Sequence, residues 1–333
     1  MERNFTSHYH FLTHGKDLTV EDLFLDELAS IRLRLGMAAT AGLASGSSIS
    51  MGDVVPEVAS HILIGKIVKR DFDTRMELWL SQIAKARARG AHISLDYTDH
   101  HRVSNSPLSP FYLKVFEFVD SIIVPSHHLR ESLQCDKTIG QPVFAIEDPI
   151  ECKVLPPKKT AANQPAALWF GHGSNLKFLV DYLAKWPEAA PSDLHIVSSP
   201  DVLAAMQQMN ISAPRPIDIH FHEWTITKVE EIAPLVSLCV IPSDTGSHKA
   251  FASANRLVTS LALGIPTAAS TIPSYAEFAD YFMPLESKNI DEFFAAPHTY
   301  ADRLRQFQAN VAGRFSRENA VACWNKLLTQ QHS

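Results

Sequence analysis

Short apolar segments alternate with helical patterns along most of this chain, and the alternation starts afresh near its middle. In the first half, apolar segments of strand length lie at 61–67, 91–95, 121–124 and 143–146. Strands that alternate with helices form a parallel sheet covered by helices on both faces. The pattern therefore predicts an α/β chain, and its restart predicts two doubly wound domains.

The second half follows residues 153–165, a segment with three prolines and three lysines that has the composition of a linker. Apolar strand segments then recur at 167–170, 194–197, 217–221, 238–241 and 267–270, and helical patterns occupy 300–330. We predict a first domain over 1–152, the linker at 153–165 and a second domain over 166–333. Two tandem Rossmann-like domains place a cleft between the carboxyl ends of their strands, where ligands bind.

The first sixty residues fit this pattern less regularly. A short apolar segment covers 9–13, and apolar side chains at helical spacing predict a helix over 20–35. Residues 37–52 are rich in Ala, Gly and Ser, which predicts a loop.

Composition excludes several classes of protein. Of the 333 residues, 36 are acidic and 30 basic, so nucleic acid is not an expected partner. No apolar run reaches the length of a membrane-spanning helix, and the N-terminus lacks the pattern of a signal peptide. The four cysteines form no CxxC pair, which argues against a zinc ribbon and fits a reducing cytoplasm.

Two glycines flank His172 directly after the strand predicted at 167–170. Gly171 and Gly173 allow a close approach of the backbone to a ligand, and the following helix offers free N–H groups to an anion. A tight turn capped by Ser174 or Asn175 explains the same residues. The dinucleotide fingerprint GxGxxG is absent, which disfavours an NAD-dependent enzyme.

Cations gather after the strand predicted at 238–241. Lys249 lies in the polar loop, and Asn255 and Arg256 open the next helix. A cation in the first turn opposes the helix macrodipole unless an anion is bound nearby. Two cations beside a helix N-terminus suit a diphosphate without a metal, although a solvated lysine and a surface arginine remain the alternative.

Residues 240–277 carry a resemblance to a known family. Val-Ile-Pro-Ser, Asn-Arg-Leu, Ala-Leu-Gly-Ile-Pro-Thr-Ala-Ala-Ser and Ile-Pro-Ser-Tyr-Ala-Glu follow one another there. This series resembles the donor-binding half of GT-B glycosyltransferases, especially those of family 4 (group 1). Residues 220–224, 90–100 and 120–126 are similar to other parts of that fold. The resemblance implies two Rossmann-like domains and sugar transfer from a nucleotide-sugar donor, with no metal or other cofactor.

The sequence departs from the family at one point. Family 4 enzymes usually carry two glutamates before the Gly-x-Pro turn, and here Thr259 and Phe251 occupy the corresponding positions. The departure leaves retaining and inverting outcomes both open.

The resemblance also implies roles for individual residues. The donor diphosphate would be held by Lys249, Asn255, Arg256, Gly171, His172 and Gly173. The nucleoside or sugar would be bordered by Glu223, Trp224, Ser274, Tyr275 and Glu277. Trp224 is equally well explained as an aromatic side chain packed at the edge of the core. Glu277 is equally well explained as a helix cap or a solvent-exposed side chain.

A general base is expected where polar residues follow the strand at 91–95. Asp96, Asp99 and His100 are the candidates, with Asp99 or His100 preferred, and His101 follows them. His and Asp together can also bind a metal, but no third group of ligands has a recognisable spacing, so no metal site is predicted. Lys66 either faces the same site or is a structural lysine.

We therefore expect a glycosyltransferase acting on a glycan, a lipid-linked sugar or another hydroxyl acceptor in bacterial cell-surface glycoconjugate synthesis. The alternatives are an epimerase or hydrolase of sugar nucleotides and a non-catalytic scaffold of the same fold. The expected location is the cytoplasm or the inner face of the membrane. Basic pairs and triplets at Arg32/Arg34 and Lys85/Arg87/Arg89 are compatible with either peripheral membrane contact or solvated faces.

Overall fold

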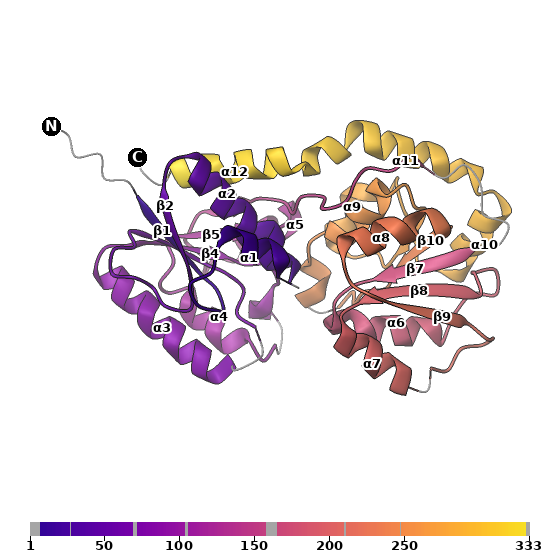
Figure 1. Cartoon of the computed structure of the whole chain (residues 1–333), viewed down its shortest axis with the longest axis horizontal. Coiled ribbons are helices and arrows are strands. Elements are labelled where there is room, and N and C mark those ends of the chain that lie inside the picture. Colours follow the sequence, from indigo (N-terminus) through magenta and orange to yellow (C-terminus); the bar gives the residue numbers. More distant parts are fainter. Residues whose placement is uncertain are drawn as a thin grey trace. The chain divides into compact units, whose positions relative to one another are not determined.

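The computed structural model describes residues 7–26, 28–68, 72–103, 106–157, 165–209, 211–246 and 248–330. The chain divides into two compact units, each built on its own parallel sheet (Figure 1). The first unit comprises Met1–Pro149, Phe251–Ser253 and Arg317–Ser333, and the second comprises Ile150–Ala250 and Ala254–Ser316.

The first unit contains a six-stranded sheet in the order β2-β1-β3-β4-β5-β6, and every pairing is parallel. The strands are β1 (His8–Leu12), β2 (Ser48–Gly52), β3 (His61–Ile64), β4 (His92–Asp96), β5 (Ser121–Val124) and β6 (Val143–Ala145). Parallel strands require crossover connections, and these are supplied by helices on both faces.

Helices cover both faces of this sheet. They are α1 (Val20–Leu25), the π-helix η1 (Ile31–Leu35), α2 (Gly36–Ala44), α3 (Phe72–Ala88), the 3₁₀ turn η2 (His101–Val103), α4 (Ser109–Val115), α5 (His127–Cys135) and α12 (Arg317–Gln330). Trp79 of α3 and Phe111 of α4 pack on one face of the sheet, and Trp324 of α12 packs on the other.

The predictions for the first sixty residues were partly wrong. The helix expected over 20–35 is divided into α1 and η1, and the loop expected over 37–52 contains α2 and β2. The small side chains of α2 are buried rather than mobile. A side chain at Gly42 would come within 2.9 Å of Ile49, so small residues are needed for this close packing.

The C-terminal helix belongs to the first unit, not to the second as predicted from the sequence. In Figure 1, α12 lies beside α2. Trp324, Leu327 and Leu328 join the apolar cluster of the first unit, and the Tyr9 hydroxyl donates to the carbonyl of Leu328 at 2.8 Å. The residues joined by this hydrogen bond are 319 positions apart in sequence, beyond any local pattern.

The second unit contains a six-stranded parallel sheet in the order β12-β11-β10-β7-β8-β9. The strands are β7 (Ala166–Phe170), β8 (Asp193–Ser198), β9 (Asp218–Glu223), β10 (Leu238–Ile241), β11 (Thr267–Ala269) and β12 (Met283–Pro284). The buried runs 166–170 and 238–241 are apolar throughout, as is typical of strands covered on both faces.

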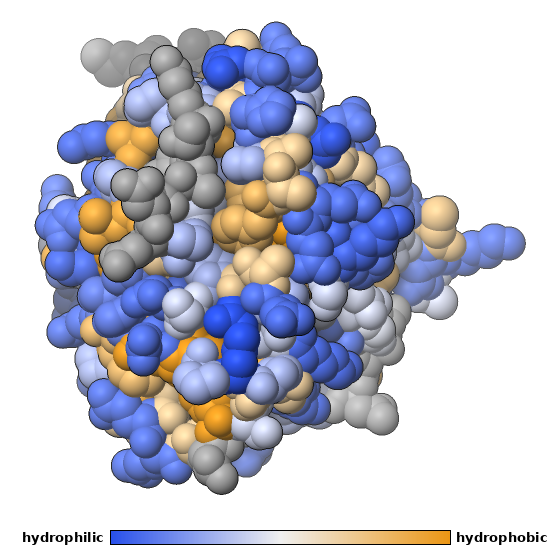
Figure 2. Space-filling model, turned by 90° about the vertical axis from the view of Figure 1, so that its right-hand side faces the viewer, coloured by the Kyte–Doolittle hydropathy of each residue, from blue (hydrophilic) through white to orange (hydrophobic). Residues whose placement is uncertain are grey.

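The helices of the second unit also pack on two faces. They are α6 (Leu176–Leu183), α7 (Pro200–Gln208), α8 (Ile226–Ile232), α9 (Asn255–Ala262), α10 (Ser287–Ala295) and α11 (His298–Asn310). Short 3₁₀ turns are η3 (Gly173–Asn175), η4 (Ala233–Leu235), η5 (His248–Phe251), η6 (Pro273–Phe278) and η7 (Ala312–Phe315). Hydrophilic residues cover most of the face seen in Figure 2, with smaller hydrophobic areas between them.

The structure bears on two possible kinds of membrane contact, a spanning helix and a basic surface. Within the described ranges, no helix is both long enough and apolar enough to cross a bilayer. Arg32 and Arg34 are 5% and 1% exposed, so they cannot contribute to a basic surface, contrary to one of the sequence-based alternatives.

We predict that Trp324→Ala destabilises the first unit by about 3–5 kcal/mol, because it removes a fully buried aromatic side chain from the face covered by α12. Urea unfolding, followed by circular dichroism, measures the loss. Cys323→Ala on the exposed side of the same helix is the control and is expected to change stability little. Equal effects of the two substitutions would contradict this packing.

Candidate functional site

The strand order of the second sheet reverses between the neighbouring strands β7 and β10, which makes this a topological switch point. Strands β8 and β9 extend the sheet on one side of β7, whereas β10 and β11 extend it on the other. Ligands of open α/β sheets bind outside the carboxyl ends of the strands at such a switch point. Gly171 follows β7, and Ser243 follows β10 at this point.

Arg256 joins these two strand ends. It lies in the first turn of α9, and its Nη2 donates to the Ser243 hydroxyl at 3.1 Å. A side chain built on Gly171 would come within 3.4 Å of Arg256 Nη1. The backbone of Ser243 is held in turn by the Ser270 hydroxyl, at 2.9 Å, from the end of β11. The candidate donor site thus assembles residues from three neighbouring strand ends.

The guanidinium of Arg256 is incompletely paired. Its Nη1 is shielded from solvent and forms no hydrogen bond with any described residue. A shielded cationic donor without a partner is costly, and an anion bound beside it would remove that cost. The site is therefore suited to a phosphate or carboxylate group.

Tyr275 lies under the same arginine. Its side chain is 1% exposed. Burial raises the pKa of the Tyr275 phenol, while the charge of Arg256 and hydrogen bonds with Ser243 and Arg256 partly offset that rise. The phenol therefore stays neutral and helps to orient the arginine. Ser274, its neighbour, is 4% exposed, and its hydroxyl has no hydrogen-bond partner among the described residues.

The Gly171–Gly173 segment forms a tight connection to η3 and α6. The Ser198 hydroxyl donates to the carbonyl of Gly171 at 2.6 Å, and Nδ1 of His172 accepts from the backbone N–H of Ser174 at 3.2 Å. A side chain at Gly173 would lie 2.8 Å from Val202. Glycine is thus required by packing at position 173, and at position 171 it leaves room for Arg256.

The remaining residues predicted to bind the donor do not all lie beside Arg256. Asn255 opens α9, whereas the side chain of Lys249 lies outside the described part of the chain. Glu223 is exposed at the end of β9, and Trp224 packs against the core. Glu277 forms two hydrogen bonds with Arg314, at 2.6 and 3.1 Å. Ser243 was not predicted as a site residue, although its place after a strand signalled it.

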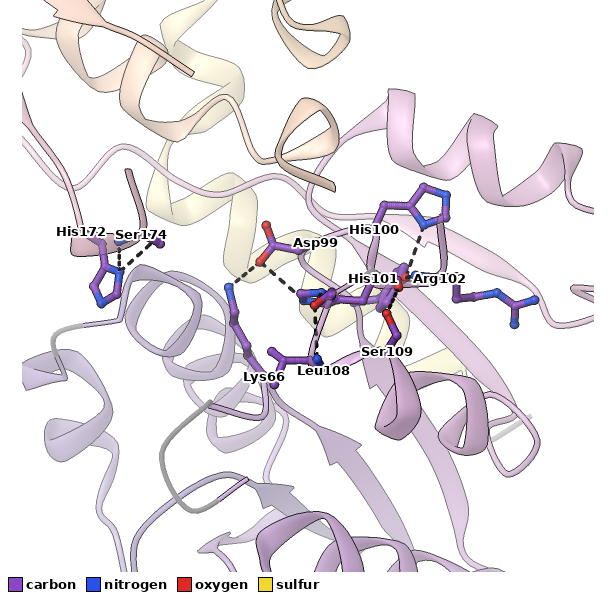
Figure 3. Close-up of polar contacts among 11 residues, drawn as sticks. Lys66, Asp99, His100, His101, Arg102, Leu108, Ser109, His172 and Ser174 are labelled. Atoms are coloured by element: carbon purple, nitrogen blue, oxygen red, sulfur yellow. Dashed lines mark hydrogen bonds and ion pairs between the residues drawn. The ribbon is translucent and has the colours of Figure 1, made fainter. Parts of the chain in front are cut away.

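In the first unit, Asp99 pairs with Lys66. Lys66 Nζ lies 2.5 Å from Asp99 Oδ2, and both side chains follow neighbouring strands, β3 and β4 (Figure 3). Nε2 of His101 lies 3.9 Å from the same carboxylate oxygen. The His101 ring stacks on Tyr112 with its centroid 4.7 Å away. Lys66 is therefore ion-paired with Asp99, the preferred candidate base.

His100 is held on both sides of its ring. Nδ1 lies 3.3 Å from the Tyr97 hydroxyl and Nε2 lies 3.3 Å from the Ser132 hydroxyl. Burial lowers the pKa of His100 to about 4, and the charge of Arg102 acts in the same direction. His100 is therefore neutral at pH 7. The His100 ring also packs edge-on to the ring of Phe251, with 4.9 Å between the centroids. Phe251 belongs to the short segment Phe251–Ser253, which is part of the first unit.

Asp96 occupies a different environment from Asp99. It is fully buried, and Arg34 Nε donates to both of its carboxylate oxygens, at 2.6 and 2.9 Å. Burial raises the pKa of Asp96 to about 6, although the charge of Arg34 opposes the rise. Both oxygens are occupied and screened from solvent, so Asp96 is placed to anchor the end of β4 rather than to meet a substrate.

No group of three His, Cys, Asp or Glu side chains within the described ranges is arranged to hold a metal ion. All four cysteines are free, two of them buried.

The chain is similar to known proteins in structure but not in sequence. No protein-family model matches the chain, and no curated protein matches its sequence. Among solved structures, sucrose-phosphate synthase from Thermosynechococcus elongatus has a TM-score of 0.62 at 12% identity, covering 98% of this chain and 99% of that one. Anabaena HepE, determined with UDP and glucose, has a TM-score of 0.60 at 14% identity, covering 97% and 98%.

WaaG, a glycosyltransferase involved in lipopolysaccharide biosynthesis, is also similar. Its TM-score is 0.54 at 11% identity, covering 95% of this chain and 98% of that one. The chain thus has the GT-B fold of two Rossmann-like domains, as the sequence predicted, and its similarity to these enzymes extends over nearly the full length.

We predict that neutral His100 makes the stability of the first unit sensitive to acid. Its pKa is lower in the folded chain, about 4 against 6.5, so its contribution is complete above pH 6.5 and is lost as the pH falls toward 4. His100→Gln should therefore lose less free energy of unfolding than the wild type between pH 7 and 4.5. Urea unfolding at each pH measures this. Exposed His298→Gln is the control, and identical pH slopes for wild type and His100→Gln would refute the prediction.

Proposed function

We propose that this protein is a glycosyltransferase that moves a sugar from a nucleotide-sugar donor to a hydroxyl group of an acceptor. The observation that carries the proposal is the incompletely paired guanidinium of Arg256 at the switch point of the second sheet. It offers charged donors to an anion where α/β sheets bind ligands. HepE, which shares the fold, was determined with UDP and glucose, and this supports a nucleoside diphosphate as the anion.

Each residue of the candidate donor site has a chemical role in this proposal. Arg256, with Asn255 and the N-terminus of α9, binds the diphosphate and stabilises the charge that develops as it leaves. Gly171 allows the phosphates to come close. Lys249 adds a second cation, so that the reaction requires no metal. His172, Gly173, Ser274 and Tyr275 border the phosphates and sugar, and Glu223 and Trp224 border the nucleoside. Glu277 reaches the sugar only if its pair with Arg314 opens.

Asp99 is the proposed reactive carboxylate of the first unit. The acceptor O–H loses its proton, a bond forms between that oxygen and the anomeric carbon, and the bond from this carbon to the diphosphate breaks. Asp99, which is paired with Lys66, accepts the proton of the acceptor, or it stabilises positive charge on the sugar while the departing diphosphate takes that proton. His100 stays neutral behind it, where it supports the loop.

The biological setting is proposed more broadly. We infer a glycan or lipid-linked acceptor in bacterial cell-surface glycoconjugate synthesis, as for WaaG, which is involved in lipopolysaccharide biosynthesis. The reaction would take place in the cytoplasm, or at the inner face of the membrane when the acceptor is lipid-linked. No nucleic acid is expected as a partner of this acidic chain.

We predict that Arg256→Ala weakens nucleotide binding by roughly 10- to 100-fold, the effect of losing a charge-assisted hydrogen bond of about 1.5–3 kcal/mol. Thermal shifts with UDP, GDP, dTDP, CMP and their sugars identify the ligand on the wild type. Arg305→Ala, an exposed arginine of the same unit that pairs with Asp302, should bind as the wild type does. No shift with any nucleotide on the wild type would overturn the proposed function.

We predict that Asp99→Asn lowers kcat by about 10²–10⁴-fold and leaves the affinity for the selected nucleotide unchanged. The asparagine keeps the shape but loses the charge that pairs with Lys66. Asp120→Asn, at the amino end of β5, is the control and should retain wild-type kcat. Sugar release from donor without acceptor would indicate a hydrolase or epimerase. Tight nucleotide binding with no turnover of any donor would indicate a non-catalytic scaffold.

A further inference from the structure

Arg34 makes several buried polar contacts in the first unit. The side chain lies in the π-helix η1 and is 1% exposed. Its Nε donates to Asp96, and its Nη1 donates to the carbonyl of Ile146 at 2.6 Å and to the carboxylate of Asp148 at 2.9 Å. Its guanidinium carbon lies 5.6 Å from the ring centroid of Trp324. One cation therefore contacts three separate segments of the chain, around Asp96, residues 146–148 and Trp324.

These segments have particular positions in the chain. Asp96 ends β4, and the following residues 97–101 carry Asp99. Asp148 directly precedes Pro149, the last residue of the first unit before the chain enters the second. Trp324 lies on α12, after the chain has returned at Arg317. Arg34 thus links the loop that bears the proposed reactive carboxylate to the C-terminal end of the segment Met1–Pro149 and to the separate segment Arg317–Ser333.

The charge of Arg34 and the charges of Asp96 and Asp148 stabilise one another in the buried cluster. One guanidinium faces two carboxylates, and both carboxylates are almost fully buried. Buried carboxylates without a cation would be strongly destabilised. Only the planar fork of arginine can serve Asp96, Ile146 and Asp148 together, because a lysine presents a single nitrogen. Arg34 Nη2 is buried without a hydrogen-bond partner among the described residues. The arginine therefore makes these contacts at the cost of one unsatisfied donor.

We propose that Arg34 is a positioning residue for the transfer reaction: it fixes the loop 97–101, and with it Asp99, relative to residues 146–148 at the boundary of the unit. Arg34 bonds both to Asp96, directly before this loop, and to Asp148 at the boundary. Displacement of residues 146–148 would therefore be transmitted to Asp99 through Arg34 and Asp96. This inference rests on the proposed function, since Asp99 is the group that is positioned.

The first test is independent of activity. Hydrogen–deuterium exchange is measured on full-length wild type, Arg34→Lys and the milder Asp148→Asn, which keeps an acceptor at the same place. We expect at least tenfold faster exchange in peptides that cover 96–101 and 143–149, with exchange in β7 to β11 of the second unit unchanged. The control is Arg32→Lys, a buried arginine of the same π-helix that donates to the carbonyl of Asp26 instead. Faster exchange spread evenly over the first unit would overturn the proposal.

The second test separates positioning from stability. With the nucleotide sugar selected on the wild type, Arg34→Lys and Asp148→Asn should lower kcat by at least tenfold while donor KM stays within twofold. A merely structural role predicts wild-type kcat for the folded fraction, and that result would overturn the proposal. If the wild type binds no nucleotide, the proposed function fails, and the exchange experiment still decides whether Arg34 holds the loop.

Discussion

The structure depends on burying two fully parallel sheets on both faces. Strands so placed can carry few polar side chains, so polar chemistry collects where the strands end. Because neighbouring parallel strands end at the same edge, residues distant in sequence become neighbours there. Lys66 and Asp99 meet because β3 and β4 are adjacent. Ser243 and Ser270 meet because β10 and β11 are adjacent.

Two arginines show opposite solutions to the cost of shielding a cation. Arg34 faces two carboxylates and a backbone carbonyl, so its charge is compensated by the protein itself. Arg256 is paired with neutral hydroxyls, those of Ser243 and Tyr275, and its Nη1 lacks a partner among the described residues. The first arrangement stabilises a fixed structure, whereas the second gains stability when an anion arrives. These different surroundings underlie the positioning role that we propose for Arg34 and the binding role that we propose for Arg256.

The sequence predicted those features that depend on local pattern. Apolar runs such as 166–170 and 238–241 indicated buried parallel strands, and residues after strand ends, such as Arg256, were recognised as candidates for binding. The helix α2 was missed because its Ala and Gly residues resemble a loop until α12 is seen packed against them. Asp96 and Asp99 looked equivalent in sequence. Their roles separate only because Arg34 and Lys66, about 60 and 30 residues away, pair with one each.

Thr259 and Phe251, at the positions where the sequence departs from the family that it resembles, have different surroundings. Thr259 is 3% exposed within α9, and the thiol of Cys152 donates to its carbonyl at 3.8 Å, so the position is part of the core. Phe251 packs against the rings of His100 and His128, at 4.9 and 5.2 Å between centroids. A carboxylate at position 251 would have to give up these ring contacts. For a reaction that requires a carboxylate, the side chain that we propose in place of these glutamates is Asp99, which pairs with Lys66.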